Sequence, residues 1–247
     1  LSPIPESIMS AVCQFPSLEK AVLTAQEIIQ YGIPIARIEM LNSDQMDISI
    51  KYSNLKNLEI KPTLFFEFHG TENSNKEHVE VVEGLSYNNL GSKFKWAETT
   101  EERNKLWKAR HDVYYSVKSQ KNNSRVYTTD VCVPISKLVE CIKFVEIEVQ
   151  KYGLKAPMVG HVGDGNFHTT FLYDPSKKKD YDLIRNFCDK LIEKALELDG
   201  TITGEHGVGI HKKEYLVKQH GDNIPIMRSI KNTLDPNNIM NPGKIFD

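Results

Sequence analysis

Several features that identify large classes of protein are missing from this sequence. Its four cysteines, Cys13, Cys132, Cys141 and Cys188, are widely spaced and include no Cys-x-x-Cys pair, so neither a zinc knuckle nor a disulfide framework is expected. Buried free thiols are expected instead. No apolar run approaches the roughly 20 residues that span a bilayer. Leu1 is not followed by a signal or transit segment, and we expect the chain to be a trimmed part of a longer protein.

An excess of charge of one sign is also missing. The sequence has 31 lysines and arginines against 33 aspartates and glutamates, which gives a formal net charge of -2. Nothing in this balance would attract nucleic acid or an anionic membrane, and the basic residues do not cluster with aromatic ones. No nucleic-acid partner is therefore expected. The 247 residues, 40% hydrophobic and 26% charged, suffice for a globular protein with a proper core.

A glycine-rich phosphate loop is the third absence. The segments Gly163-Asp164-Gly165 and Gly207-Val208-Gly209 are too short for a dinucleotide fingerprint and stand in the wrong places. We therefore do not expect this chain to bind a whole dinucleotide by itself.

The first third of the chain has the pattern of two strand–helix–strand units. Ser17 is a predicted cap for a helix that begins at Leu18 and stops at Gly32. Residues 42–61 are polar and only weakly patterned. The remaining predictions are strands at 10–15, 33–41, 63–69 and 93–96 and a helix at 75–89. Two such units side by side predict a ferredoxin-like antiparallel sheet with helices on one face.

The rest of the chain alternates helices and strands before a tail of short helices. The predicted elements are a helix at 101–118, a strand at 126–133, a helix at 136–152, two strands around a tight turn, and a helix at 181–198. The expected fold class is therefore α+β, a cap domain with a ferredoxin-like sheet and a helical C-terminal part.

Two histidines flank a predicted turn in the segment 159–171. Asp164-Gly165 is a dipeptide favoured by two-residue type I′ turns. Such a turn would pair His161 directly with His168, with Cβ atoms about 4.5–5.5 Å apart on one face. Two imidazoles so placed can bind one divalent cation, although two histidines can also meet on a polar face without a ligand.

A second cluster with little value for packing lies at 200–209. Three glycines flank the pair Glu205-His206, and glycines so clustered indicate tight turns or close approach to a ligand. Glu205 could supply a third metal ligand and leave positions open for substrate. If the segment is extended, His206 points away from Glu205 and is free to act as a general base.

Three strings then give the chain a family resemblance. GHVGDGNFH, GTITGEHGVG and the ending LDPNNIMNPGKIF resemble the C-terminal domain of the FAD-linked oxidases of the vanillyl-alcohol-oxidase-like superfamily. Within it, the cytochrome-type D-lactate dehydrogenases are the nearer match, supported by LWKARHDVYYSV, TTDVCVPISKL, FPSLEKAV and ARIEMLN. The resemblance covers essentially the whole chain, with its motifs in the family order.

The resemblance implies roles for individual residues. His161, His168 and Glu205 resemble the ligands of a divalent metal, zinc or manganese, which would lower the pKa of the substrate hydroxyl. His206 resembles the base that takes the hydroxyl proton, while the α-hydride goes to the flavin. Arg110 resembles the arginine that binds the substrate carboxylate.

Two further assignments come from the same resemblance. Asn241, Pro242, Gly243 and Lys244 resemble a closing segment that reaches the flavin, so Asn241, Gly243 and Lys244 are candidate cofactor-binding residues. D-2-hydroxyglutarate dehydrogenases have a lysine that binds a second carboxylate where this chain has Thr128. The missing cation favours a small monoacid such as D-lactate over a dicarboxylate.

The resemblance also implies partners. The FAD-binding domain that precedes this region in the family is expected to be missing from residues 1–247, so the chain alone should be inactive or nearly so. Cytochrome c or another acceptor would take the electrons, and eukaryotic relatives suggest a mitochondrial location. Glycolate and D-2-hydroxyglutarate dehydrogenases are alternatives within the family. A metallohydrolase that uses the same three ligands, or a metal-binding module without catalysis, is the alternative outside it.

Overall fold

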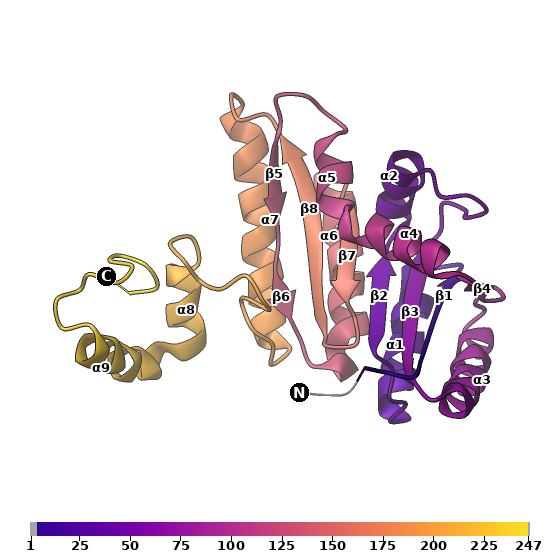
Figure 1. The fold of residues 1–247 in the computed structure, drawn as a ribbon. Coiled ribbons are helices and arrows are strands. Elements are labelled where there is room, and N and C mark those ends of the chain that lie inside the picture. The colour runs from indigo at the N-terminus through magenta and orange to yellow at the C-terminus, as the bar shows by residue number, and fades with distance from the viewer. Residues whose placement is uncertain (1–3, 247) are drawn as a thin grey trace.

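The computed structural model describes residues 4–246 and confirms an α+β fold with an antiparallel sheet and a helical C-terminal part (Figure 1). The strands are β1 (Ser7–Gln14), β2 (Arg37–Leu41), β3 (Thr63–Gly70), β4 (Lys95–Trp96), β5 (Arg125–Thr128), β6 (Val131–Cys132), β7 (Met158–His161) and β8 (Asn166–Tyr173). The helices are α1 (Leu18–Gln30), α2 (Ser43–Ser53), α3 (Glu72–Asn88), α4 (Thr100–His111), α5 (Val113–Lys118), α6 (Leu138–Tyr152), α7 (Lys178–Glu197), α8 (Lys213–His220) and α9 (Ile224–Leu234), with 3-10 turns at Ile135–Lys137 and Gly221–Asn223. None of the helices described is long and apolar enough to cross a membrane.

Two units of the same topology form one continuous sheet. Its strand order is β4-β1-β3-β2-β7-β8-β5, and β6 pairs with β8 beyond the end of β5. The first four strands have the predicted ferredoxin-like order. The second unit repeats it with β6, β7, β8 and a bridge from Cys132 to Thr201. The units join where β2 pairs antiparallel with β7.

Helices cover the two faces of this sheet unequally. On one face α3, α1, α6 and α7 pack side by side, and their apolar stripes form the main core. The other face carries α2, α4 and α5 over a smaller cluster, formed by Val12, Leu41, Met46, Phe65, Trp107, Val113 and Val159. The prediction of helices on one face, made for the first third of the chain, is right for α1 and α3, and α6 and α7 extend the same layer. Polar side chains of β2, β7 and β8 share the second face, and they form the site described below.

Local signals placed the ends of the strongest helices correctly. The Ser17 hydroxyl accepts a hydrogen bond from the N–H of Lys20 at 3.3 Å and caps α1, as predicted. Gly153 ends α6 in the left-handed region at φ 61°, where glycine has no steric cost.

Residues 42–61, whose sequence is polar and only weakly patterned, contain α2. Asn42 caps this helix by accepting a hydrogen bond from the N–H of Gln45 at 2.9 Å. Its buried side chains are only Gln45, Met46 and Ser49, so the helix has no apolar stripe for a periodicity search to find. Met46 packs in the small cluster, and the side chain of Gln45 donates to the Ser116 hydroxyl of α5 at 3.1 Å.

The helix predicted for 101–118 is broken at Asp112. The N–H of Asp112 closes α4 on the carbonyl of Lys108, and α5 begins at the next residue. Trp107 of α4 and Val113 of α5 both pack in the small apolar cluster, so the two helices cover the same part of the sheet.

Two predicted strands also differ from the structure. The strand expected at 33–41 begins only at Arg37, because Pro34 has no N–H to donate and the N–H of Ile35 donates locally to the carbonyl of Ile33 at 2.8 Å. The strand expected at 126–133 is divided into β5 and β6 between Thr128 and Val131, although both pieces pair with β8 in one register.

The cysteines are free, as predicted. Burial raises the pKa of Cys13 to about 11 and the pKa values of Cys141 and Cys188 to about 12. Cys132 is only half-buried. Three of the four are therefore inert packing residues at neutral pH.

Candidate active site and metal centre

The sheet brings the candidate ligands together in two rows of paired residues, two positions apart along the strands. In one row Glu39 of β2 is paired with His161 of β7, which is paired with Asn166 of β8. Two positions along, and therefore on the same face, His168 is paired with Val159. Val159 packs in the small cluster beneath α2, α4 and α5, and directly paired residues share a face. Both histidines therefore point to that face.

The predicted direct pairing of His161 with His168 is wrong. The turn has four residues instead of two, so His161 pairs with Asn166. A type I′ turn needs two residues with positive φ, but only Gly165, at 79°, has one here. The N–H of Asp164 donates to the carbonyl of His161 at 2.9 Å and closes the loop. The register shifts by two residues, which preserves the face, and the imidazole centres lie 6.0 Å apart.

The three candidate metal ligands meet at their outer atoms. Glu205 Oε1 lies 2.9 Å from His168 Nε2 and 3.7 Å from His161 Nε2. Each inner Nδ1 has its own acceptor, Glu39 Oε1 for His161 at 2.7 Å and the carbonyl of Thr129 for His168 at 3.0 Å. An Nδ1–H that donates inward leaves the lone pair on Nε2.

One buried atom shows that a cation fits this arrangement. His168 Nε2 is buried and has no hydrogen-bond partner, although a carboxylate oxygen lies 2.9 Å away. Two atoms that both carry lone pairs repel unless a proton or cation lies between them. Ligand atoms of His161, His168 and Glu205 all lie within 4.8 Å of one another. Two imidazoles, one carboxylate and an open side match catalytic zinc sites.

The two histidines differ in their pKa. The hydrogen bond to Glu39, together with the charge of that residue, raises the pKa of His161. Burial lowers the pKa of His168, which favours the neutral form that binds a metal. The raised pKa of His161 makes protons stronger competitors for its ring, so metal affinity should increase as pH rises through the range in which histidine titrates.

His206 lies beside the three ligands, and the expectation that it points away from Glu205 is wrong. Its ring stacks on His168 with centres 4.9 Å apart and planes 4° apart, and its Nε2 lies 3.6 Å from Glu205 Oε1. The segment is not extended, since Gly207 follows with φ 78°. The His206 side chain is 49% exposed, so a substrate can reach it.

Arg110, in the last turn of α4, reaches the same site. Its Nε and Nη2 both donate to Glu39 Oε2, at 3.0 and 2.7 Å. Burial opposes ionisation of Glu39, but the hydrogen bond from His161 and the charge of Arg110 lower its pKa. Nε and one hydrogen of Nη2 are occupied, so the outer Nη1–Nη2 edge of the guanidinium can still bind a carboxylate.

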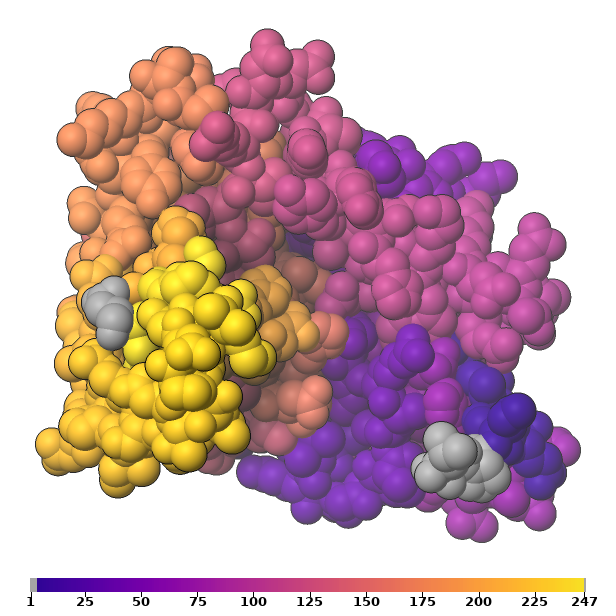
Figure 2. All heavy atoms as spheres, turned by 60° about the vertical axis from the view of Figure 1, so that its left-hand side comes forward, coloured from indigo at the N-terminus to yellow at the C-terminus, as the bar shows by residue number. Residues whose placement is uncertain are grey.

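The remaining predicted site residues lie in a cavity beside β5 or on the C-terminal segment. Thr128 and His206 line one cavity of about 770 Å³ beside β5, and the surface is hollowed between the C-terminal part and the α4–α5 segment (Figure 2). Asn241, Gly243 and Lys244 are exposed on the C-terminal segment. That segment contacts the loop after His206 through the N–H of Ile245, which donates to Gly209.

Asp130 organises the loop that carries Glu205 and His206, and the sequence reading assigned it no role. Its carboxylate accepts hydrogen bonds from the hydroxyl of Thr203 at 2.6 Å, the amide of Asn166 at 3.0 Å, and the main-chain N–H groups of Glu205 and His206 at 3.2 and 3.0 Å. Burial alone would raise its pKa, but these donors hold it well below its usual range.

The loop approaches Asp130 so closely that one position allows no side chain. A Cβ on Gly204 would lie 1.9 Å from Asn166 Nδ2 and 2.9 Å from Asp130 Oδ1. Asp130, His168 and His206 also form a second set of possible ligands. Because the Asp130 oxygens are already shared among loop donors, the set with Glu205 is the better metal site.

Asp130→Asn is expected to lower the free energy of unfolding near neutral pH by about 1–3 kcal/mol, because buried N–H groups lose an ionised acceptor. The pKa of Asp130 is depressed in the fold. Its contribution is therefore present above the ordinary value of 3.8 and lost as pH falls below it. Urea unfolding over a pH series should show the variant and the parent converging in acid. Asp182→Asn, an exposed site on α7, is the control. An equal deficit at every pH would contradict the assignment.

The signal for Glu39 and Asp130 was present in the sequence. Each is an acidic residue inside a predicted strand, and both are buried, at 9% and 2% exposure. Buried carboxylates require partners. The sequence does not say which partners, because those of Glu39 lie 71 and 122 positions away.

Comparison with known proteins shows which family and which relatives this chain resembles. The model of a family described as "FAD linked oxidases, C-terminal domain" matches residues 4–245. A protein of Danio rerio named "Probable D-lactate dehydrogenase, mitochondrial" is 43% identical over 99% of this chain and 49% of its own length. An Arabidopsis thaliana protein named "D-lactate dehydrogenase [cytochrome], mitochondrial" is 39% identical over all of this chain and 43% of its own length. The chain thus spans about half the length of these relatives.

The fold also has solved counterparts. A structure of 4-ethylphenol oxidase from Gulosibacter chungangensis superposes on all of this chain, and on 55% of its own, with a TM-score of 0.73. At 14% sequence identity, this similarity concerns the fold alone.

Proposed function

The chain belongs to the FAD linked oxidases as their C-terminal domain, and from this premise we propose that it is the substrate- and metal-binding part of a flavin-dependent D-2-hydroxyacid dehydrogenase. D-lactate, oxidised to pyruvate, is the proposed substrate. The flavin-binding half would be supplied by the part of the relatives that this chain does not match. One observation carries the proposal, namely that His161, His168 and Glu205 direct their free atoms to one point beside both His206 and Arg110.

Each residue of the site has a proposed task. The free edge of Arg110 binds the substrate carboxylate in a bidentate manner and sets the orientation of the substrate. His206, half-exposed beside the ligands, accepts the proton of the substrate hydroxyl at Nε2. A zinc or manganese ion held by His161, His168 and Glu205 would supply Lewis acidity toward that hydroxyl. FAD would supply the hydride acceptor, with the exposed residues Asn241, Gly243 and Lys244 available to contact it.

The wider setting follows from the relatives. Both relatives are named mitochondrial and one name includes "cytochrome", so a mitochondrial location and cytochrome c as the electron acceptor are part of this proposal. In the residues that the structure describes, the His206 side of the site is open to solvent. Hydride transfer requires a dry site, and the flavin-binding half is the proposed cover.

Thr128 is the residue proposed to set the size and charge of the substrate. It is paired with Thr170 of β8, which shares the face of His168, and it lines the cavity with His206. A dicarboxylic hydroxyacid would meet no lysine at this position. Thr128→Lys is therefore expected to raise the ratio of kcat/KM for D-2-hydroxyglutarate to that for D-lactate by about 10–100-fold, since one added ion pair contributes about 1.5–3 kcal/mol.

Anaerobic reduction of the flavin in the full-length protein tests both the proposed substrate and the proposed role of Thr128. D-lactate, L-lactate, glycolate and D-2-hydroxyglutarate would be mixed separately with the parent and with Thr128→Lys, and bleaching of the flavin followed. The proposal expects fastest reduction by D-lactate in the parent. Fastest reduction by glycolate or D-2-hydroxyglutarate would replace the substrate, and no reduction by any hydroxyacid would reject the function. Flavin-independent ester or amide hydrolysis would favour a metallohydrolase built on the same ligands.

A further inference from the structure

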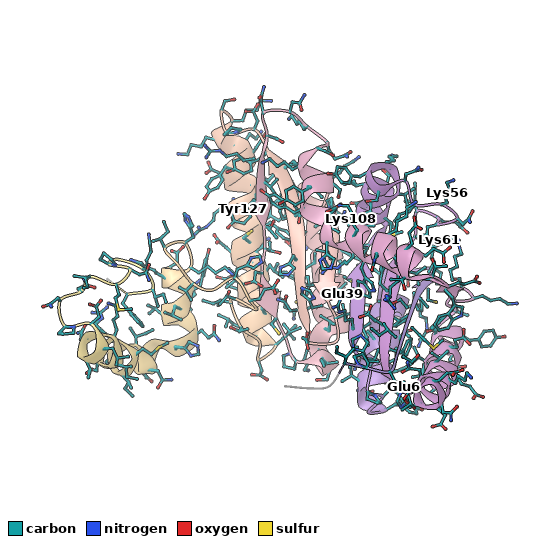
Figure 3. All side chains as sticks on the ribbon, in the orientation of Figure 1. Glu6, Glu39, Lys56, Lys61, Lys108 and Tyr127 are labelled. Carbon is teal, nitrogen blue, oxygen red and sulfur yellow. The ribbon has the colours of Figure 1, made fainter. Side chains whose placement is uncertain are left out.

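Glu39 occupies the junction between the two units of the sheet. It belongs to β2 and is directly paired with His161 of β7, and Figure 3 labels it in the middle of the sheet. The residue is 9% exposed, and both carboxylate oxygens are used. Oε1 accepts from His161 Nδ1 at 2.7 Å, and Oε2 accepts from Nε and Nη2 of Arg110 at 3.0 and 2.7 Å.

These contacts determine which atoms of both partners remain free. An ionised carboxylate can only accept, so the hydrogen of a neutral His161 must stand on Nδ1. Nε2 then carries the lone pair and faces Glu205. On Arg110, Nε and the Nη2 hydrogen beside it are occupied, and the Nη1–Nη2 edge of the guanidinium is left for a ligand. One buried carboxylate thus selects the tautomer of His161 on β7 and the orientation of the Arg110 guanidinium on α4.

We propose that Glu39 is the positioning residue of this site, holding the ring of His161 ready for the metal and the guanidinium of Arg110 ready for the substrate carboxylate. The inference rests on the proposed metal and substrate roles of those two residues. Glu39 itself touches neither metal nor substrate. Replacing a residue that orients a metal-binding histidine in this way typically weakens metal affinity by about 10–100-fold.

The same face of the sheet offers a matched control. Glu67 on the neighbouring strand β3 is 5% exposed and also binds a histidine and an arginine. Its Oε1 lies 2.9 Å from His69 Nε2 and 3.6 Å from Arg37 Nε, and its Oε2 accepts from the Ser10 hydroxyl at 3.2 Å. Within residues 4–246, Glu67 makes no hydrogen bond or ion pair with His161 or Arg110. Replacing it removes a comparably buried carboxylate without touching the site.

Glu39→Gln and Glu67→Gln should be compared by three measurements. Zinc titration of the protein should show about 10–100-fold weaker binding in Glu39→Gln only. Long-range ¹⁵N–¹H spectra of histidine-labelled protein, at alkaline pH and without metal, should show His161 moving away from the Nδ1–H form in Glu39→Gln only. In the full-length enzyme, KM for D-lactate should rise about tenfold in Glu39→Gln. Each carboxylate oxygen of Glu39 serves a different partner, and in glutamine one of the two becomes an NH2 group that cannot accept.

The outcomes separate this inference from the proposed function. Unchanged zinc affinity, His161 tautomer and KM in Glu39→Gln would overturn the positioning role, while the ligand assignments stand. Equal effects of Glu39→Gln and Glu67→Gln would also overturn it, since they would indicate general loss of structure. If the parent binds no zinc, the metal assignment fails. The tautomer and KM measurements then still decide whether Glu39 positions the two residues.

Discussion

His206→Ala in the full-length flavoprotein is expected to lower kcat for D-lactate by about 10²–10⁴-fold, the usual contribution of a positioned general base. KM should change little, because Arg110 and the proposed metal ligands remain. Stopped-flow measurement of flavin reduction isolates the step, since only loss of the hydroxyl proton and hydride transfer precede the bleaching. The ring of His206 stacks on His168 with centres 4.9 Å apart. Its Nε2 therefore lies beside the proposed metal ligands.

His220→Ala, on α8 and outside this cluster, is the control for loss of an imidazole. Flavin content of each variant must match that of the parent, so that a slow step is not confused with lost cofactor. A His206→Ala enzyme that reduces its flavin at the parental rate would remove His206 from the mechanism. The ligand assignments would survive that result.

His168→Ala is expected to abolish stoichiometric binding of zinc or manganese and to lower kcat/KM by about 10³-fold, corresponding to several kcal/mol of lost Lewis-acid stabilisation. His168 is 5% exposed and its Nε2 has no hydrogen-bond partner, so its removal takes away a buried ligand atom that faces Glu205. Plasma mass spectrometry of the purified protein gives the metal content. His161→Ala and Glu205→Ala should behave in the same way.

His69→Ala is the matched control, because His69 also stands beside a buried glutamate on this sheet but outside the ligand set. It should retain the metal of the parent. Metal that survives all three substitutions at His161, His168 and Glu205 would refute the site. Unfolding curves for each variant show whether a loss of metal follows from a loss of fold.

Sequence reasoning was strongest where the pattern is local. The helix after Ser17, the left-handed stop at Gly153 and the ferredoxin-like order of the first four strands follow from caps, periodicity and short connections. The residue types of the site were also readable, and the structure brings His161, His168, Glu205, His206 and Arg110 together.

The sequence alone could not predict the length of one turn or the partners of side chains that act over long distances in the chain. The turn at 162–165 determines the register of β7 against β8, and the Asp-Gly dipeptide alone favoured a shorter loop. Helix α2 is held by the single apolar side chain of Met46 and by the hydrogen bond from Gln45 to Ser116, not by an apolar stripe. Glu39 and Asp130 act through partners far away in the chain, so a single sequence shows them only as acidic residues in strands.

The junction of β2 with β7 has a consequence for the order of folding. Each ferredoxin-like unit is built mainly from contacts within its own part of the chain, whereas Glu39 and His161 are 122 positions apart. Closing such a separation has a large entropic cost and is favoured only once both partners present a formed surface. Folding of each unit should therefore precede assembly of the ligand cluster. The rate at which refolding protein acquires metal would then report the docking of two preformed halves.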